Sequence, residues 1–165
     1  MKKIFMVFWL GSFLIGCKST SDELTWKVKF ENQVQLANNG DPEEINILGV
    51  MHAKGLGTVQ DDYKAVEYYK KAAGLGHSQA KVNLGYMYEN GRGVEKDYSA
   101  AIELYREAML DGNTRAMRNL GWATVMGHGV EKNKEDALLL WEKCAALGDK
   151  ECSEAHAMFS SGIIP

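Results

Sequence analysis

The sequence has no apolar run long enough to cross a membrane as a helix. Its N-terminal apolar stretch, Ile4 to Leu14, is about half as long as the roughly 20 residues that a transmembrane helix needs. Lys2 and Lys3 precede this stretch, and a small residue and a polar region follow it. A positive start, a short apolar middle and a small-residue end are typical of a secretory signal peptide. We therefore predict that residues 1–16 are a signal peptide and are removed.

Cysteine is also scarce, and one of the three cysteines stands directly behind this segment. The stretch "LIGC", which ends at Cys17, resembles the bacterial lipobox. The resemblance implies cleavage before Cys17, attachment of a diacylglycerol to its thiol, and a lipidated linker over residues 17–24. Lys18 stands where retention in the inner membrane would favour aspartate, so the resemblance implies an outer-membrane anchor facing the periplasm. The alternative is an unmodified cysteine near an ordinary cleavage site.

Positive charge is not in excess. Two of the 19 basic residues, Lys2 and Lys3, lie in the signal peptide, which leaves 17 against 22 acidic residues and a net charge of −5. Proteins that bind nucleic acids usually carry a basic stripe that displaces counterions from phosphates. We therefore predict no nucleic-acid partner. The 149 residues that remain after cleavage are enough for one domain.

Motifs for catalysis and for cofactors are missing as well. None of the four histidines forms the i, i+4 pair with a glutamate that a zinc hydrolase helix needs. The stretches "GRGV" and "GHGV" lack the lysine and the serine or threonine of a phosphate-binding loop. We therefore predict no catalytic residue, no metal and no cofactor.

What the sequence does contain is an internal repeat. Three segments, "INILGVMHAKGLG", "KVNLGYMYENGRG" and "MRNLGWATVMGHG", superpose without gaps at a spacing of 36 residues, which is a period of repeat architectures. Leu48, Leu84 and Leu120 fall in register, and a glycine follows each of them. The period divides the chain into full repeats over residues 41–76, 77–112 and 113–148.

Each repeat predicts two amphipathic helices. In the second repeat, apolar residues recur at i, i+4, i+7 and i+8 from Ala80, and at i, i+3, i+4, i+7 and i+10 from Tyr98. Either pattern gives a helix one apolar face. Gly91 and Gly112 can adopt the left-handed conformation that ends a helix. Gly85 would weaken an isolated helix by about 1 kcal/mol, so we predict that a neighbouring helix approaches closely there.

Helix starts are marked at one register position. Asp41, Asn113 and Asp149 occupy it, and their side chains suit an N-cap. His77 occupies the same position in the second repeat. Because histidine is an exception in this set, we predict that Ser78 caps that helix instead.

The recurring positions resemble the Sel-1-like repeat, a relative of the tetratricopeptide repeat. The stretch "AKVNLGYMYENGRGVEKDYSAAIELY" fits this pattern almost throughout, and the resemblance covers about Lys29 to Ala157. It implies an all-α fold, an α-solenoid of antiparallel helix-turn-helix repeats with a 36-residue period over residues 25–160, followed by a tail at 161–165. His156 departs from the pattern, which favours a capping helix over residues 150–160. In such solenoids the first helices line a concave surface that binds a protein or peptide.

The two cysteines outside the lipobox replace a pair of small residues. The register equivalents of Cys144 and Cys152 are Ala72 with Ala80 and Ala108 with Ala116. Cysteine-rich members of the family bridge adjacent helices with closely spaced cysteines, so the resemblance implies a disulfide between Cys144 and Cys152, which an oxidising periplasm permits. Two buried thiols, or a metal site that uses His156, are the alternatives.

Variable positions on the first helices are the candidates for partner contact. Two large aromatics, Tyr86 and Trp122, stand in successive repeats, and such side chains dominate the binding energy of many interfaces. The alternative is that they pack in the core, and both interpretations stay open for Trp122. Asn83 and Asn119 follow the family pattern, and hydrogen bonding to the backbone between repeats is an alternative for both. The full set of candidates is Val50, Lys54, Asn83, Tyr86, Asn90, Asn119, Trp122 and Met126.

These features predict a lipid-anchored, periplasm-facing protein-interaction module rather than an enzyme. The resemblance implies a more specific hypothesis, an immunity protein that neutralises an envelope-targeted toxin such as a secreted phospholipase. Two alternatives stay open. Some cysteine-rich members of the family are linked to β-lactam binding or hydrolysis, and a structural adaptor of the envelope would also suit an anchored solenoid.

Overall fold

The computed structural model describes residues 20–161, which form eight helices and no strand. The predicted signal peptide, Cys17 and residues 162–165 lie outside the described residues. No helix between residues 20 and 161 combines the length and the apolar character that crossing a bilayer requires. The helices are α1 (Thr20–Ala37), α2 (Pro42–Lys54), α3 (Asp62–Gly74), α4 (Ser78–Asn90), α5 (Tyr98–Leu110), α6 (Thr114–Met126), α7 (Lys134–Ala146) and α8 (Lys150–Ser160).

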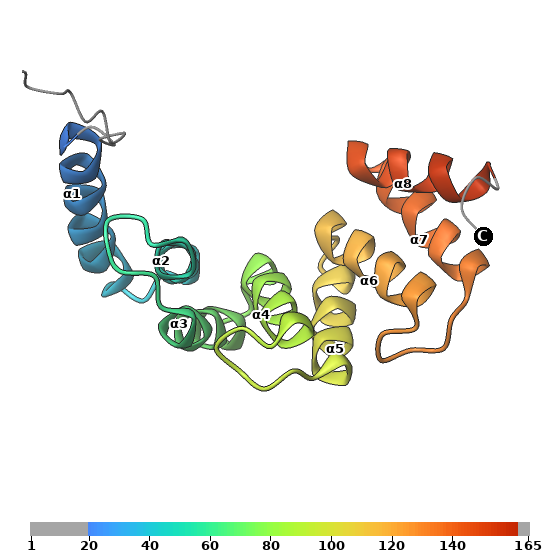
Figure 1. Ribbon diagram of the computed structural model, residues 1–165, viewed down its shortest axis with the longest axis horizontal. Helices are drawn as coiled ribbons and strands as arrows, with labels where there is room; N and C mark the ends of the chain where they lie inside the picture. The colour runs from blue at the N-terminus through green and yellow to red at the C-terminus, as the bar shows by residue number, and fades with distance from the viewer. Residues whose placement is uncertain (1–19, 162–165) are drawn as a thin grey trace, which may run out of the picture.

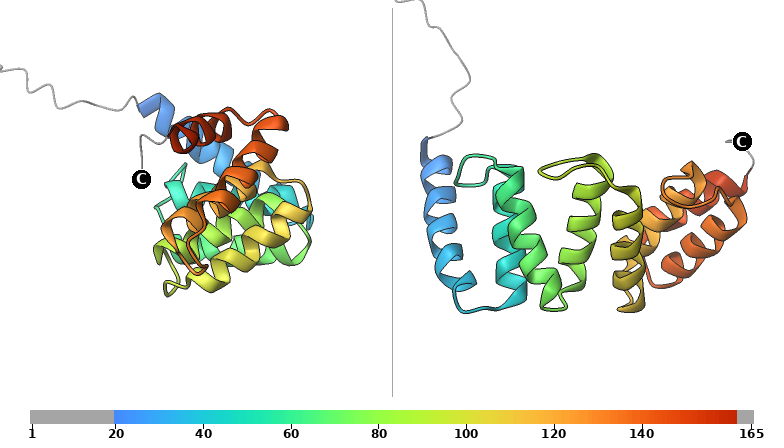
Figure 2. Two further views of the ribbon diagram at one scale, coloured as in Figure 1. Left: turned by 90° about the vertical axis from the view of Figure 1, so that its right-hand side faces the viewer. Right: turned by 90° about the horizontal axis from the view of Figure 1, so that it is seen from below.

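The helices form a curved stack in which each helix packs against the next one along the chain. Figure 1 shows an arc with α2, α4, α6 and α8 on its inner side and α3, α5 and α7 on its outer side. Seen from below, the helices lie side by side across the long axis of the molecule (Figure 2, right). This arrangement confirms the predicted all-α solenoid of helix-turn-helix repeats.

Each repeat packs an aromatic ring of its second helix onto the glycine of its first helix. The pairs are Gly49 with Tyr69, Gly85 with Tyr105 and Gly121 with Trp141. A Cβ atom at Gly85 would lie 2.6 Å from Cε1 of Tyr105, which is well inside van der Waals contact. The three rings are buried. The missing Cβ therefore allows the close approach that the sequence predicts.

Helix α1 takes the place of a second helix that precedes the first full repeat. Its Trp26 lies one period before Asp62 of α3 and two periods before Tyr98 of α5. The second glycine of each interhelical turn packs against the backbone at one of these positions, and the pairs are Gly57 with Trp26, Gly93 with Asp62 and Gly129 with Tyr98. Helix α1 begins at Thr20, so it extends into the segment 17–24 that the sequence analysis assigns to a linker.

The N-caps Asp41, Asn113 and Asp149 are confirmed, because each side chain accepts a hydrogen bond from a backbone N–H in its first helical turn. The prediction for α4 is wrong. His77 is the N-cap there, and its Nδ1 accepts a hydrogen bond from the backbone N–H three residues later at 3.1 Å. An unprotonated imidazole nitrogen accepts as an amide oxygen does. The Ser78 hydroxyl instead accepts a hydrogen bond from Nδ2 of Asn113 at 3.0 Å.

Candidate partner-binding groove

A hollow of about 430 Å³ lies between the first helices α2, α4 and α6, on the inner side of the arc in Figure 1. We call it the inner groove. Five of the predicted partner-binding residues line it, namely Val50, Lys54, Asn83, Tyr86 and Asn119. The structure therefore brings together residues from three consecutive repeats in one concave surface.

Tyr86 is the exposed aromatic side chain of the inner groove, with 46% of its surface accessible. It belongs to α4, the middle one of the three helices that build the groove. Val50, one repeat earlier, is half-buried and packs against the cluster that contains Tyr69 and Met87. Because a large exposed ring offers contact area at low entropic cost, Tyr86 is better suited than Val50 to anchor a partner.

Trp122 shares the register position of Tyr86 but does not line the inner groove. Its ring lies edge-on to the ring of Trp141 at 5.2 Å and to that of Phe159 at 5.5 Å. Phe159 belongs to α8, so the terminal helix partly covers this position. The Trp122 ring thus packs largely against core side chains. Partner contact by this residue stays a prediction.

Asn90 and Met126 stand at the ends of α4 and α6, outside the lining of the inner groove. Nδ2 of Asn90 donates a hydrogen bond to the backbone carbonyl of Tyr86 at 2.8 Å. Met126 is about half exposed. Partner contact by these two residues also stays a prediction.

A chain of amide side chains in the lining of the groove holds α2 and α4 together. Nδ2 of Asn83 donates to Oδ1 of Asn46 at 2.8 Å, and Oδ1 of Asn83 accepts from Nε2 of Gln79 at 3.2 Å. Asn46 is buried, so these bonds satisfy a polar group that burial would otherwise leave unpaired. The link between the repeats runs through side chains here, whereas one interpretation of Asn83 predicts a bond to the backbone.

Sequence patterns do not single out Arg92, which lies in the turn after α4 and lines the inner groove. Its guanidinium donates hydrogen bonds to both carboxylate oxygens of Asp62, at 2.7 and 3.0 Å, and one to the carbonyl of Ala53 at 3.2 Å. The hydrogen bonds with Asp62 raise the pKa of Arg92 and lower the pKa of Asp62. The register equivalents, Leu56 and His128, are not arginines, so no recurring signal marks this link.

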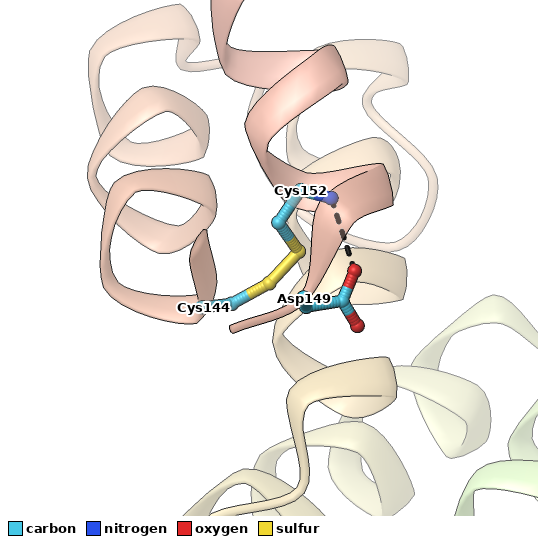
Figure 3. Close-up of side chains that lie close together, drawn as sticks. All are labelled: Cys144, Asp149 and Cys152. Carbon is cyan, nitrogen blue, oxygen red and sulfur yellow. Dashed lines mark hydrogen bonds between the residues drawn. A yellow bond between two sulfur atoms is a disulfide. The ribbon is translucent and has the colours of Figure 1, made fainter. Parts of the chain in front are cut away.

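The disulfide joins Cys144 of α7 to Cys152 of α8 (Figure 3), with the Cα atoms 6.0 Å apart. Asp149 lies beside it, accepts a hydrogen bond from the Cys152 N–H at 3.1 Å, and pairs with Arg118 of α6 at 3.1 Å. Burial alone would raise the pKa of Asp149, but the Cys152 N–H and the Arg118 charge together lower it. These contacts fasten the last helix to α7 and to α6.

The same cluster does not offer a metal site while the disulfide is formed. The ligand atoms of Cys144, Asp149 and Cys152 lie within 4.8 Å of one another. Metal ions such as zinc bind thiolates, and the disulfide leaves neither cysteine as a thiolate. The structure thus contains the disulfide rather than either alternative of the sequence analysis, which were two buried thiols and a metal site that uses His156.

A stack of helix pairs with a groove along its first helices defines this chain as an α-solenoid repeat protein. The family model of the Sel1 repeat matches residues 45–77, 78–113 and 114–149, so the chain belongs to the Sel1 repeat family. Sel1 repeats are protein-interaction modules, and membership is consistent with a protein partner.

Similar solved structures come from three bacteria. A Sel1 repeat protein from Oxalobacter formigenes is 29% identical, with a TM-score of 0.69, over 79% of this chain and 60% of that one. A protective antigen present in uropathogenic Escherichia coli strains, which displays an SLR fold, is 30% identical, with a TM-score of 0.72, over 76% of this chain and 27% of that one. Helicobacter pylori cysteine-rich protein B is 25% identical, with a TM-score of 0.64, over 78% of this chain and 96% of that one.

The chain spans less than two thirds of the length of the first two of these proteins. A search of curated proteins found no match.

Proposed function

We propose that this chain is a lipid-anchored module of the cell envelope that binds a protein partner through its inner groove. The observation that carries the proposal is the exposed Tyr86 in a groove built by three consecutive first helices. Helices already packed in place offer a preformed surface, so binding requires little additional ordering of the chain.

The anchor in this proposal is the lipidated Cys17, at the outer membrane and facing the periplasm. The lipobox-like "LIGC" supports it, because several acyl chains on one cysteine hold a protein firmly to a bilayer. Two residues separate Cys17 from the start of α1 at Thr20, and such a tether reaches at most about 10 Å. The tether would therefore hold the start of α1 close to the membrane surface.

A more specific form of the proposal is an immunity protein that neutralises a toxin delivered to the envelope, such as a secreted phospholipase. Small lipoproteins with repeats of this kind act in that role, and an acidic body held at the bilayer suits the blocking of an enzyme there. Deletion of the gene should then expose the cell to toxicity from a neighbouring gene product. A tight complex with a harmless partner would contradict the immunity role while leaving the interaction module intact.

Crosslinking in cells followed by pull-down tests the groove directly, by comparison of the wild type with Tyr86→Ala and Tyr63→Ala. Tyr63 is a matched control, because it is 76% exposed, belongs to α3 and does not line the inner groove. We expect the wild type and Tyr63→Ala to capture one specific partner. Tyr86→Ala should bind this partner at least about tenfold more weakly, which is the effect of removing an interface hot spot. Equal capture by all three proteins, or by none of them, would contradict the proposal.

A further inference from the structure

The inner groove carries positive charge although the chain as a whole is acidic. The sequence has 22 acidic and 19 basic residues, yet the groove lining contains Lys54, Arg92 and Arg115 and no aspartate or glutamate. Charges of one sign gathered in a concave surface attract ligands of the opposite sign. The groove thus differs in charge from the rest of the molecule.

Two of these three cations have no ion-pair partner among residues 20–161. Arg92 is held by Asp62, which balances it. Lys54 and Arg115 are exposed, and neither forms an ion pair with another residue in the described part of the chain. Lys54 belongs to α2 and Arg115 to α6, the two helices that flank α4 and its Tyr86. A ligand in the groove can therefore reach a cation on each side of the aromatic ring.

Arg115 stands where the helix itself disfavours a cation. It lies in the first turn of α6, and the partial positive charge of a helix N-terminus favours acidic side chains there. The register equivalents in α2 and α4 are Glu43 and Gln79, and Glu43 follows that preference. Local helix stability thus gives no reason for an arginine at this position, whereas an anionic ligand in the groove does.

We propose that the inner groove binds an acidic segment of the partner protein, whose carboxylates pair with Lys54 and Arg115 while an apolar side chain packs on Tyr86. This inference rests on the proposed function and specifies the chemistry of the partner. Lys54 lies on α2 and Arg115 on α6, so a segment that pairs with both has to cross α4 between them. Eight residues in extended conformation reach about 26 Å, and the test therefore uses peptides of this length.

The test is the binding of the full-length lipidated protein, in detergent, to an array of eight-residue peptides. Each array sequence is presented in three versions that carry glutamate, glutamine or lysine at the same positions. We expect the glutamate versions to bind about tenfold more tightly than the glutamine versions, with a preference that weakens as salt is added. The double variant Lys54→Glu, Arg115→Glu should reverse the preference towards the lysine versions.

A second charge reversal, Lys71→Glu with Lys150→Glu, is the matched control. Both lysines are exposed and lie outside the inner groove, so this variant should keep the preference of the wild type. A milder variant, Lys54→Gln with Arg115→Gln, should bind the three versions about equally, and circular dichroism checks that every variant is folded.

The proposal is overturned if the wild type prefers the glutamine or lysine versions, if it binds no peptide at all, or if the groove variant keeps the glutamate preference. Each of these results leaves the proposed function standing as long as Tyr86→Ala still loses the captured partner in cells. Retention of that partner by Tyr86→Ala would instead refute the groove itself as the binding surface.

Discussion

At Gly85 a single missing Cβ atom determines how closely the two helices of a repeat approach. We expect Gly85→Ala to lower the free energy of unfolding by about 1–3 kcal/mol, because the added methyl would collide with the buried ring of Tyr105. Gly74→Ala is the control, since a Cβ on that helical glycine meets no atom within 4 Å. This control should raise the stability by about 0.5–1 kcal/mol. Urea unfolding measures both changes, and equal effects of the two substitutions would contradict the packing described for Gly85.

His52 is a second position where one side chain affects the stability of the fold. It is 4% exposed, stacks on Tyr68 at 5.4 Å, and meets the edge of Phe30 of α1 at 5.3 Å. Its Nδ1 has no hydrogen-bond partner among the described residues. Burial lowers the pKa of His52, the nearby Lys64 lowers it further, and Asp61 opposes the shift. The fold therefore favours the neutral imidazole.

The stability that neutral His52 contributes should depend on pH. The unfolded chain takes up a proton at this residue near pH 6.5 and the folded chain only at lower pH, so the contribution is present above about pH 6.5 and is lost as the pH falls through the folded pKa. We expect the wild type to lose more thermal stability between pH 7 and pH 5 than His52→Phe, which keeps a ring but has no proton to gain. Identical slopes for the wild type and His52→Phe would refute this role.

At the scale of helices, the disulfide fastens α8 to α7 at the C-terminal end of the stack. The double variant Cys144→Ala, Cys152→Ala restores the alanine pairs of the earlier repeats, so it removes the crosslink with little change in packing. We expect it to lower the free energy of unfolding by about 2–3 kcal/mol, on the chain-entropy estimate for a short loop. Reductant should destabilise the wild type by a similar amount and leave the variant unchanged. A wild type that is insensitive to reductant would contradict a stabilising bond, and hydrogen exchange in α8 shows where the loss occurs.

The sequence predicts the helices and the disulfide, whereas other contacts between repeats cannot be read from it. Caps such as Asp41 and the glycines beside aromatic rings recur every 36 residues, so the repeat register reveals them. The pairing of Arg92 with Asp62 joins residues 30 positions apart, and no other repeat has this cation. Trp122 occupies the same register position as Tyr86, but Phe159 of α8 packs against its ring. Because α8 covers the last repeat, equivalent positions in successive repeats have different environments there.

At the scale of the whole molecule, the curvature of the solenoid gathers side chains that are far apart in sequence. Lys54, Tyr86 and Arg115 come from three repeats and line one groove. Each repeat alone offers one helix face, and only the stack provides a concave surface. The sequence predicts which helices face inward, but it does not show that the cations collect there, because that requires the three-dimensional lining of the groove.

The central claim is that a partner protein binds in the inner groove, and site-specific photocrosslinking in cells tests it most directly. A photoreactive residue is placed in separate variants at Val50 or Tyr86 in the groove, and at Tyr63 or Leu139 on the second helices, which are exposed and lie outside the groove. We expect one protein to crosslink from both groove positions and from neither of the other two. Crosslinks from Tyr63 and Leu139 but from neither groove position would contradict the claim.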